Sequence, residues 1–191
     1  LCEKFAIEAK IIPVTDNTIE TRVNTDEGEM HLQEFWVKHR GRNKVEGIQY
    51  IGSEKARPNP DAINAIQNSK LVIIAPANPY TSIGPILAIK AIRKELVKNR
   101  RKVVAISPII GNAALSGPAA KYMESAGNEV SAYGVAKMYA NVCSKIVIDT
   151  KDRMQTKKIE TLNMQVYDTK IRMTNKKTED ALASFILKQV T

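Results

Sequence analysis

Two hydrophobic patterns divide the sequence near residue 56. Before that point, runs rich in Thr, Ile and Val, and one segment that alternates between apolar and polar residues, predict β-strands. The predicted strands cover residues 11–14, 18–25, 29–38 and 45–51. Asp26-Glu27-Gly28 predicts a hairpin turn, because Gly28 is free to adopt a positive φ. We therefore expect residues 11–52 to form an antiparallel β insertion beside a larger sheet.

After residue 56, helical periods alternate with short, unbroken apolar runs. Such runs are typical of strands that are buried on both faces of a parallel sheet. Helices are predicted over residues 61–66, 86–96, 118–126, 135–142 and 179–190, and strands over residues 71–75, 103–106, 145–148 and 161–166. This alternation predicts an α/β core over residues 56–191, with a mostly parallel sheet and helices on both faces, in a single domain over residues 1–191.

Polar segments follow each predicted core strand. Ligands bind beyond the carboxyl ends of strands in such sheets, and these ends meet at one edge when the strands are parallel. The segments are residues 76–85, residues 107–112, Asp149, and Asp168-Thr169. We therefore expect a ligand site at this edge, with Asp149 and Asp168 as catalytic candidates by location alone.

The loop at residues 78–85 has the features of a phosphate-binding site. Thr81 and Ser82 directly precede a predicted helix, whose first backbone N–H groups are free and lie at the positive end of the helix dipole. Their hydroxyls add donors, and Gly84 would let a ligand approach the backbone. The alternative is an ordinary N-cap by Ser82 in a turn stiffened by prolines. The neighbouring loop at residues 107–112, which is also rich in Gly and Pro, favours a ligand site.

Charge and composition limit the classes of partner. The 191 residues carry a formal net charge of +9, and a positive charge of this size can favour binding to nucleic acids, membranes or anionic small ligands. The basic residues form separate groups and do not interleave with aromatic residues, which make up 5% of the chain. The longest apolar run, residues 71–75, is too short to span a bilayer. We expect neither a nucleic acid nor a membrane as partner, and we place residues 98–102 at a helix end remote from the ligand.

A few polar residues in unusual positions complete the candidates. Glu34 shares one strand face with Leu32 and Trp36, so its carboxylate would need a partner or a function unless the register is different and Glu34 faces water. His31 and His39 have a spacing that suits no metal site. Cys2 and Cys143 form no metal or redox motif, so we expect two reduced thiols in a cytoplasmic protein.

Five segments, in order along nearly the whole chain, resemble the 2-phospho-L-lactate transferase (CofD-like) family. The segments are residues 33–37, residues 56–58, residues 71–87, residues 107–119 and residues 147–149. The third contains Asn78-Pro79-Tyr80-Thr81-Ser82-Ile83-Gly84-Pro85 and is the most specific. The resemblance implies a Rossmann-like fold and a homodimeric enzyme of coenzyme F-420 biosynthesis.

The resemblance also implies a reaction and its substrates. The enzyme would move a phospholactyl group, or a related enolpyruvyl-phosphate group, from a guanosine diphosphate-activated donor to the terminal ribityl hydroxyl of the deazaflavin Fo. GMP would leave, and Mg²⁺ would assist.

Residue roles follow by position in the matching segments. The donor diphosphate would be bound by the first loop, through Asn78, Pro79, Thr81, Ser82, Ile83 and Gly84. Pro108, Ile109 and Gly111 would form a second loop beside it, and Gln33, Glu34 and Trp36 would line the acceptor side. Glu34 joins Asp149 and Asp168 as a catalytic candidate.

The chain departs from the family pattern in two places. The family opens with a Gly-rich strand-to-helix turn and carries an acidic metal ligand in its first half, and neither is present here. We therefore assign no metal ligand, and because the chain starts at Leu1 in what looks like the end of a helix, we expect further residues upstream. Ala113 and Ser116 stand where family members often carry Lys, so we expect no cationic clamp from this loop.

The alternative is a non-enzymatic, nucleotide-sugar-binding regulator of the related gluconeogenesis-factor family. It shares Tyr80-Thr81-Ser82-Ile83 but typically has Gly-Ser-Leu in place of Ala77-Asn78-Pro79. It also lacks the Gly84-Pro85 pair. Both differences favour the transferase family.

Overall fold

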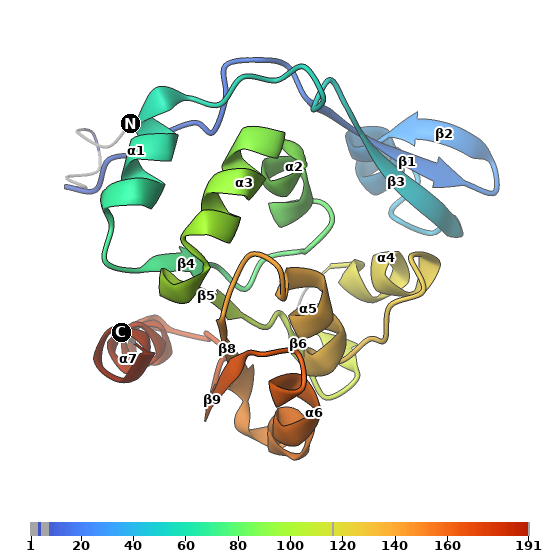
Figure 1. Cartoon of the computed structure of the whole chain (residues 1–191). Coiled ribbons are helices and arrows are strands. Elements are labelled where there is room, and N and C mark those ends of the chain that lie inside the picture. The colour runs from blue at the N-terminus through green and yellow to red at the C-terminus, as the bar shows by residue number, and fades with distance from the viewer. Residues whose placement is uncertain (1–3, 5–7, 116, 191) are drawn as a thin grey trace.

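A three-stranded antiparallel sheet forms one end of the molecule, which we describe from a computed structural model covering residues 4, 8–115 and 117–190 (Figure 1). Its strands are β1 (Glu20–Thr25), β2 (Gly28–His31) and β3 (Val45–Ile51), in the order β2-β1-β3. Gly28 has a φ of 108°, which confirms the predicted hairpin turn. Residues 11–14 form no strand, so that prediction is wrong.

The prediction of one strand over residues 29–38 is also wrong, because the chain leaves the sheet after His31. Residues Glu34–Lys38 form a short π-helical turn, η2. An ion pair of 2.9 Å between Glu34 and Lys38, four residues apart, stabilises this turn. The turn buries Phe35 completely and leaves Trp36 47% exposed, so apolar residues that would alternate on a strand take different sides of a helix.

The main sheet has four parallel strands, as predicted. These are β4 (Val72–Ile74), β5 (Val103–Ile106), β8 (Lys145–Asp149) and β9 (Gln165–Thr169), in the order β4-β5-β8-β9. The central strands β5 and β8 are buried along almost their whole length. β4 lies at the edge of the sheet and Ile73 is 43% exposed, so the prediction that this strand is buried on both faces is wrong.

The fourth strand begins later than predicted. Residues 161–163 form a turn in which Asn163 has a φ of 56°, and β9 starts at Gln165. Asp168 and Thr169 therefore lie within the strand, at its carboxyl end, instead of beyond it.

Helices cover both faces of this sheet, as predicted (Figure 1). They are α1 (Pro60–Asn68), α2 (Ile83–Ala88), α3 (Lys90–Lys98), α4 (Ala119–Ser125), α5 (Ala132–Tyr139), α6 (Thr156–Glu160) and α7 (Lys176–Phe185), which continues as η5 (Ile186–Val190). The helix predicted over residues 86–96 is two helices, because Ile89 has an extended backbone between α2 and α3.

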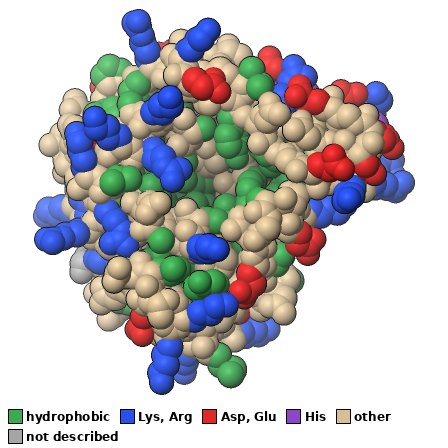
Figure 2. Space-filling model, turned by 45° about the vertical axis from the view of Figure 1, so that its right-hand side comes forward, with side chains coloured by type: hydrophobic (Ala, Val, Ile, Leu, Met, Phe, Trp, Pro, Cys, Tyr) green, Lys and Arg blue, Asp and Glu red, His purple; other side chains and the backbone are tan. Residues whose placement is uncertain are grey.

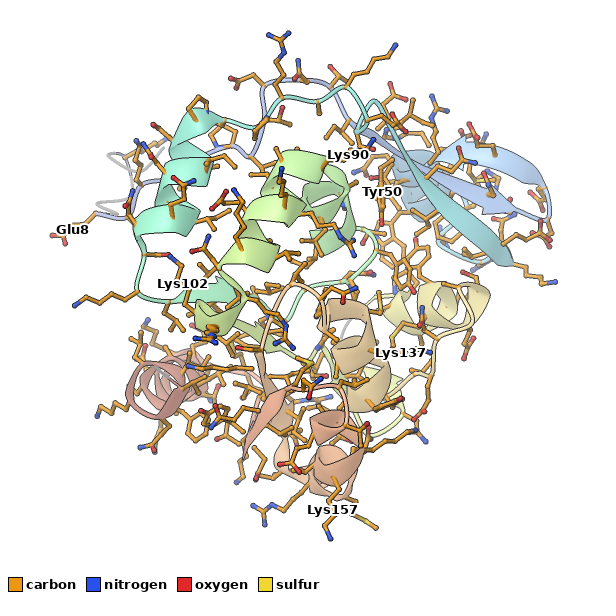
Figure 3. The ribbon with its side chains drawn as sticks, viewed as in Figure 1. Glu8, Tyr50, Lys90, Lys102, Lys137 and Lys157 are labelled. Carbon is orange, nitrogen blue, oxygen red and sulfur yellow. The ribbon has the colours of Figure 1, made fainter. Side chains whose placement is uncertain are left out.

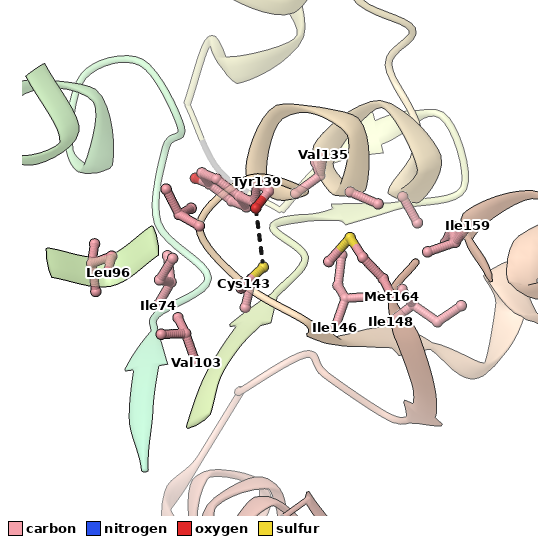
Figure 4. Packing of buried hydrophobic residues seen from close by; sticks show 14 of the residues in the cluster. Ile74, Leu96, Val103, Val135, Tyr139, Cys143, Ile146, Ile148, Ile159 and Met164 are labelled. Carbon is pink, nitrogen blue, oxygen red and sulfur yellow. Dashed lines mark hydrogen bonds between the residues drawn. The ribbon is translucent and has the colours of Figure 1, made fainter. Parts of the chain in front are cut away.

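Two apolar clusters, one on each face of the four-stranded sheet, form the core around it, and a third joins the antiparallel sheet to η2 and α4. The larger packs α3, α5 and α6 against the sheet and includes Tyr139, Cys143 and Met164 (Figure 4). The smaller packs α7 and η5 against the other face through Leu182 and Ile186. Cys143 is a free, buried thiol whose pKa is raised to about 12 by burial, whereas Cys2, the predicted helix end at residues 1–3 and 5–6, and Ser116 lie outside the described residues.

The basic residues are spread over several elements, and some of them donate hydrogen bonds that join parts of the fold. Figure 2 shows Lys and Arg spread over the visible face with Asp and Glu among them, and Figure 3 shows Lys90, Lys102, Lys137 and Lys157 on different elements. The basic turn η3 (Arg100–Lys102) precedes β5, at the opposite edge from the predicted ligand site. Arg100 donates to the carbonyl of Ala140, and Lys102 donates to that of Gln67.

Candidate functional site

A cavity of about 450 Å³ lies between the loop after β4 and the chain that follows β2. Cavities of this size are typical of small-molecule sites. Its lining residues are Leu32, Gln33, Trp36, Pro76, Ala77, Asn78, Thr81, Ser82, Gly117, Pro118 and Tyr122. The fold thus brings together three parts of the chain: the first loop at residues 76–82, the predicted acceptor side at residues 32–36, and residues 117–122.

Asn78 organises the first loop with its side chain and its backbone. Its Oδ1 atom accepts hydrogen bonds from the backbone N–H groups of Tyr80 (3.0 Å) and Thr81 (3.2 Å). Its carbonyl accepts from those of Ser82 (3.0 Å) and Ile83 (3.1 Å). The predicted cradle of free backbone N–H groups is therefore wrong at these four positions, because Asn78 already satisfies them.

The hydroxyls of Thr81 and Ser82 are the donors that remain. Ser82 stands at the N-cap of α2 but makes no side-chain capping bond, so the alternative of an ordinary serine cap is wrong. Within the part of the chain that the structure describes, neither hydroxyl makes a hydrogen bond. Both residues line the cavity, and both hydroxyls are therefore available to a ligand.

Gly84 has a packing role that the sequence did not indicate. A Cβ atom on Gly84 would lie 1.9 Å from the Tyr50 hydroxyl. Tyr50 reaches from β3 toward α2 (Figure 3) and donates to the Tyr80 carbonyl at 2.6 Å. Pro79 is buried and Ile83 packs on the core, so these two residues and Gly84 support the loop from outside the cavity.

A group of three aromatic side chains, which the sequence pattern did not indicate, supports the cavity. The ring of Tyr122 lies 6.1 Å from those of Phe35 and Tyr80, and Asn128 donates to the Tyr80 hydroxyl at 2.8 Å. Tyr122 is 1% exposed, and its hydroxyl has no hydrogen-bond partner among the described residues. Burial raises the pKa of Tyr122 to about 12, so this hydroxyl stays protonated at neutral pH.

The three residues predicted to line the acceptor side do not all face the cavity. Gln33 and Trp36 line the cavity, but Glu34 does not. The hydrogen bond from Lys38 lowers the pKa of Glu34, whose side chain is 41% exposed. Of the two alternatives for Glu34, the one that faces water is therefore confirmed, because Glu34 lies on the solvent side of η2.

The second loop lies outside the cavity and supports residues that line it. Pro108, Ile109 and Gly111 do not line the cavity. Ile109 is fully buried in a small hairpin of β6 (Ile109–Ile110) and β7 (Ala113–Ala114), which turns at Gly111 with a φ of 62°. This hairpin leads to Gly117 and Pro118, which do line the cavity.

A buried carboxylate that the sequence did not indicate anchors this hairpin. Asp152, in η4 (Thr150–Gln155), is 3% exposed and accepts from the Gly111 N–H at 2.9 and 3.1 Å. Gln155 donates to it at 3.3 Å. Burial raises the pKa of Asp152, nearby Asp149 adds to this effect, and the Gly111 N–H opposes it.

This raised pKa predicts a pH-dependent stability. The folded protein binds the Asp152 proton more tightly than the unfolded chain does, so this contribution to stability is full below the ordinary carboxyl pKa of about 4. It is lost as the pH rises through the raised folded pKa. Asp152→Asn keeps one acceptor and does not titrate, so the wild type should lose stability relative to this variant as the pH rises above about 4.

Asp152→Ala is the contrasting variant. It leaves the Gly111 N–H and the Gln155 amide without this acceptor, which should cost about 1–3 kcal/mol. Urea unfolding of the three proteins across this pH range measures both effects. If the free energies of unfolding of wild type and Asp152→Asn changed with pH in the same way, burial would not raise the pKa of Asp152.

The catalytic candidates Asp149 and Asp168 lie at the predicted edge but in a different cavity, of about 800 Å³. Asp149 is 5% exposed and accepts from the backbone N–H groups of Lys151 (3.1 Å) and Ile171 (3.2 Å). Asp168 pairs with Arg153 at 2.6 Å. Neither carboxylate lines the cavity that contains Thr81 and Ser82.

A third, smaller cavity lies between these two. Its lining residues are Pro76, Leu115, Arg172, Met173 and Thr174. It shares Pro76 with the Ser82 cavity, and Arg172 and Thr174 with the larger one. The residues predicted to form one site at the carboxyl edge of the sheet are therefore divided between separate cavities.

The described residues around Ser82 do not fit a magnesium ion, because no carboxylate lines that cavity. Within residues 8–115 and 117–190, no cluster of three His, Cys, Asp or Glu side chains could hold a metal. His31 accepts from the Gln33 N–H at 3.1 Å, and His39 lies 3.8 Å from Glu27. In the same part of the chain, no helix is long and apolar enough to cross a membrane.

Curated relatives match almost the whole chain. A 2-phospho-L-lactate transferase of Methanosarcina mazei is 39% identical over 187 residues, which cover 98% of this chain and 61% of that protein. One of Methanocaldococcus jannaschii is 44% identical over 183 residues, which cover 90% of this chain and 58% of that protein. The chain thus spans about 60% of the length of these relatives.

The fold and the family agree with this match. The crystal structure of protein BH3568 from Bacillus halodurans, a member of the upf0052 family, has a TM-score of 0.65 and 13% identity, and the match covers 97% of this chain and 64% of that one. That likeness shows the fold alone. The model of the family described as 2-phospho-L-lactate transferase CofD matches residues 1–189. The chain therefore belongs to the CofD family of 2-phospho-L-lactate transferases.

Proposed function

We propose that this chain supplies the donor-phosphate side of a transferase active site. The donor is a guanosine diphosphate-activated phospholactate or a related enolpyruvyl compound, and the acceptor is the terminal ribityl hydroxyl of the deazaflavin Fo. Family membership supports the reaction class. The observation that carries the proposal is the pair of unpartnered hydroxyls, Thr81 and Ser82, in a cavity that Trp36 also lines.

The reaction is a displacement at phosphorus. The acceptor oxygen forms a bond to the phosphorus that carries the lactyl group, and the bond from this phosphorus to the oxygen of the GMP phosphate breaks. The electron pair leaves with GMP, and the acceptor hydroxyl loses its proton. Rate acceleration in such reactions comes mostly from positioning the reactants and from stabilising charge on the phosphate oxygens.

Thr81 and Ser82 would act on those oxygens. Two neighbouring hydroxyl donors, fixed by the Asn78 turn, can hold the phosphate groups in line with the acceptor without first breaking other hydrogen bonds. The proposal assigns no magnesium ligand and no general base to the described residues. Asp149 and Asp168 are not given the role of base, because both line the neighbouring cavity.

Trp36 and Gln33 would form the acceptor side. The indole of Trp36 is 47% exposed, and a flat deazaflavin ring can stack on such a surface. Trp36→Ala should therefore raise the KM for Fo about tenfold, equivalent to about 1.4 kcal/mol, with little change in the KM for the donor.

Steady-state kinetics with each substrate varied in turn test this prediction. Val37→Ala is the matched control, since Val37 is the next residue of η2, is 71% exposed and does not line the cavity. An unchanged KM for Fo in Trp36→Ala, or an equal rise in Val37→Ala, would remove Trp36 from the acceptor side.

Ligand selectivity separates the transferase from the nucleotide-sugar-binding regulator. A ligand at 100 times its Kd stabilises a protein by about 2.7 kcal/mol, which a thermal-shift measurement detects readily. We expect GDP and GMP to raise the Tm, and uridine diphosphate sugars to have little effect. A shift with the uridine ligands alone would favour the regulator and contradict the proposed donor.

A further inference from the structure

A cavity of about 800 Å³, larger than the one that contains Thr81 and Ser82, has no role in the proposed transfer. It lies at the carboxyl ends of β8 and β9, beside α7. The two strand ends, the segment after β9 and the first turns of α7 supply its walls. The residues that line it are Ile110, Asp149, Thr150, Lys151, Arg153, Asp168, Thr169, Lys170, Arg172, Thr174, Thr178, Ala181 and Leu182.

This cavity carries an excess of positive charge. Four cationic and two acidic side chains line it. Arg153 is neutralised by Asp168, to which it donates two hydrogen bonds of 3.1 and 2.6 Å. Lys151, Lys170 and Arg172 make no salt bridge and no side-chain hydrogen bond within the part of the chain that the structure describes. None of these three cations therefore forms an ion pair there, and Lys151 interacts with Asp152 only through longer-range electrostatics.

Some of the other polar groups that line this cavity already make hydrogen bonds within the protein, and others do not. Both carboxylate oxygens of Asp149 accept backbone N–H groups, so this residue is held inside the fold. The N-terminus of α7 is closed by a capping box, in which the Asn175 side chain accepts from the Thr178 N–H and the Thr178 side chain accepts from the Asn175 N–H. The hydroxyls of Thr169 and Thr174 make no hydrogen bond in the described part of the chain, so they add two donors to the three cations.

The floor of the cavity is apolar. Leu182 is 4% exposed and Ile110 is partly buried, and Ala181 extends this surface along α7. A ligand that suits such walls has an anionic group for the cations and a flat or apolar body for the floor. A phosphate group suits the rim better than a single carboxylate, because its two charges and three oxygens can engage an Arg and two Lys together.

We propose that this cavity is a second ligand site, which binds a nucleoside phosphate through Lys151, Lys170 and Arg172, separately from the Ser82 cavity. The site is confined to one concave surface, which favours a small molecule over a nucleic-acid strand. The proposal does not depend on the transfer reaction, since none of these three residues lines the cavity with Thr81 and Ser82.

Titration calorimetry with AMP and with inorganic pyrophosphate tests the proposal. AMP carries the apolar body and pyrophosphate does not, so AMP should bind more tightly relative to its charge. The double variant Lys170→Gln and Arg172→Gln should weaken the binding of both probes at least tenfold. Lys157→Gln with Arg101→Gln removes the same charge from exposed positions outside the cavity and should leave the affinity unchanged.

Ser82→Ala distinguishes the two cavities and should also leave the affinity for AMP unchanged. Amide chemical shifts give an independent readout, and AMP should move those of residues 169–174 and not those of residues 78–84. Three results would each overturn the proposal: no saturable binding to the wild type, an equal loss in the Lys157/Arg101 control, or a loss in Ser82→Ala alone. The last result would place the probe in the transferase cavity.

Discussion

Replacing Ser82 with alanine is expected to lower kcat/KM for phosphoryl-group transfer about 100-fold. Loss of one donor to a charge that develops in a transition state costs about 2.7–4 kcal/mol. We expect the cost of losing the Ser82 hydroxyl to lie near the lower end of this range, because the Thr81 hydroxyl remains. The Ser82 hydroxyl makes no hydrogen bond in the described part of the fold. The free energy of unfolding should therefore change by no more than about 0.5 kcal/mol, as for an ordinary surface substitution.

A matched serine keeps this prediction specific. Ser184 is exposed on α7 and lines none of the three cavities, so Ser184→Ala should retain wild-type kinetics. Both variants are measured for donor affinity and for turnover. If Ser82→Ala retained both at the wild-type level, Ser82 would not hold the donor.

Gly84→Ala is expected to destabilise the fold by about 2 kcal/mol or more. The new methyl group would lie 1.9 Å from the Tyr50 hydroxyl and 3.1 Å from the Pro79 carbonyl, so Tyr50 must move. That movement breaks its hydrogen bond to the Tyr80 carbonyl, which joins the β1–β3 sheet to the loop before α2. For a domain of this length, the Tm should fall by about 4–8 °C.

Gly47→Ala is the control in the neighbouring strand, because a Cβ there would meet only the Asn24 side chain, at an ordinary 3.7 Å. Its Tm should change much less than that of Gly84→Ala. Adding Tyr50→Phe to Gly84→Ala removes the closest clash and should recover part of the loss. A Tm for Gly84→Ala equal to that of the wild type would show that Gly84 is not needed for the Tyr50 contact.

The central strands could be predicted from the sequence because their pattern is local. Val103–Ile106 and residues 146–148 are entirely apolar, and such short runs are typical of strands buried on both faces of a parallel sheet. The exposure of Ile73 on β4 could not be predicted in this way. It depends on which strands pair with each other, and an apolar run carries no information about its neighbours.

The error over residues 29–38 has a different cause. Alternation over a few residues does not separate a strand from a helical turn, since both can place one aromatic residue inward. A signal was nevertheless present, because Glu34 and Lys38 are four residues apart with the acidic residue first. That spacing favours a helix, and the structure shows the ion pair.

The candidate site could be located from the sequence but not resolved. The rule for parallel sheets predicts that the loop at Thr81 and Ser82 lies at the carboxyl edge, and in the structure the loop follows β4 there and lines a cavity. The roles of Gly84 and Asp152 could not be found, because each depends on a tertiary contact. Gly84 makes room for Tyr50, and Asp152 holds Gly111 across 41 residues of sequence.

The central claim is that Thr81 and Ser82 hold the donor phosphates during transfer to a hydroxyl acceptor. The most direct measurement is a transfer assay with the guanosine diphosphate-activated donor, Fo and Mg²⁺, in which mass spectrometry quantifies both products. We expect GMP and phospholactylated or enolpyruvyl-phosphorylated Fo in equal amounts, and a rate about 100-fold lower for Ser82→Ala. No transferred product from the wild type, or a wild-type rate from Ser82→Ala, would contradict this claim.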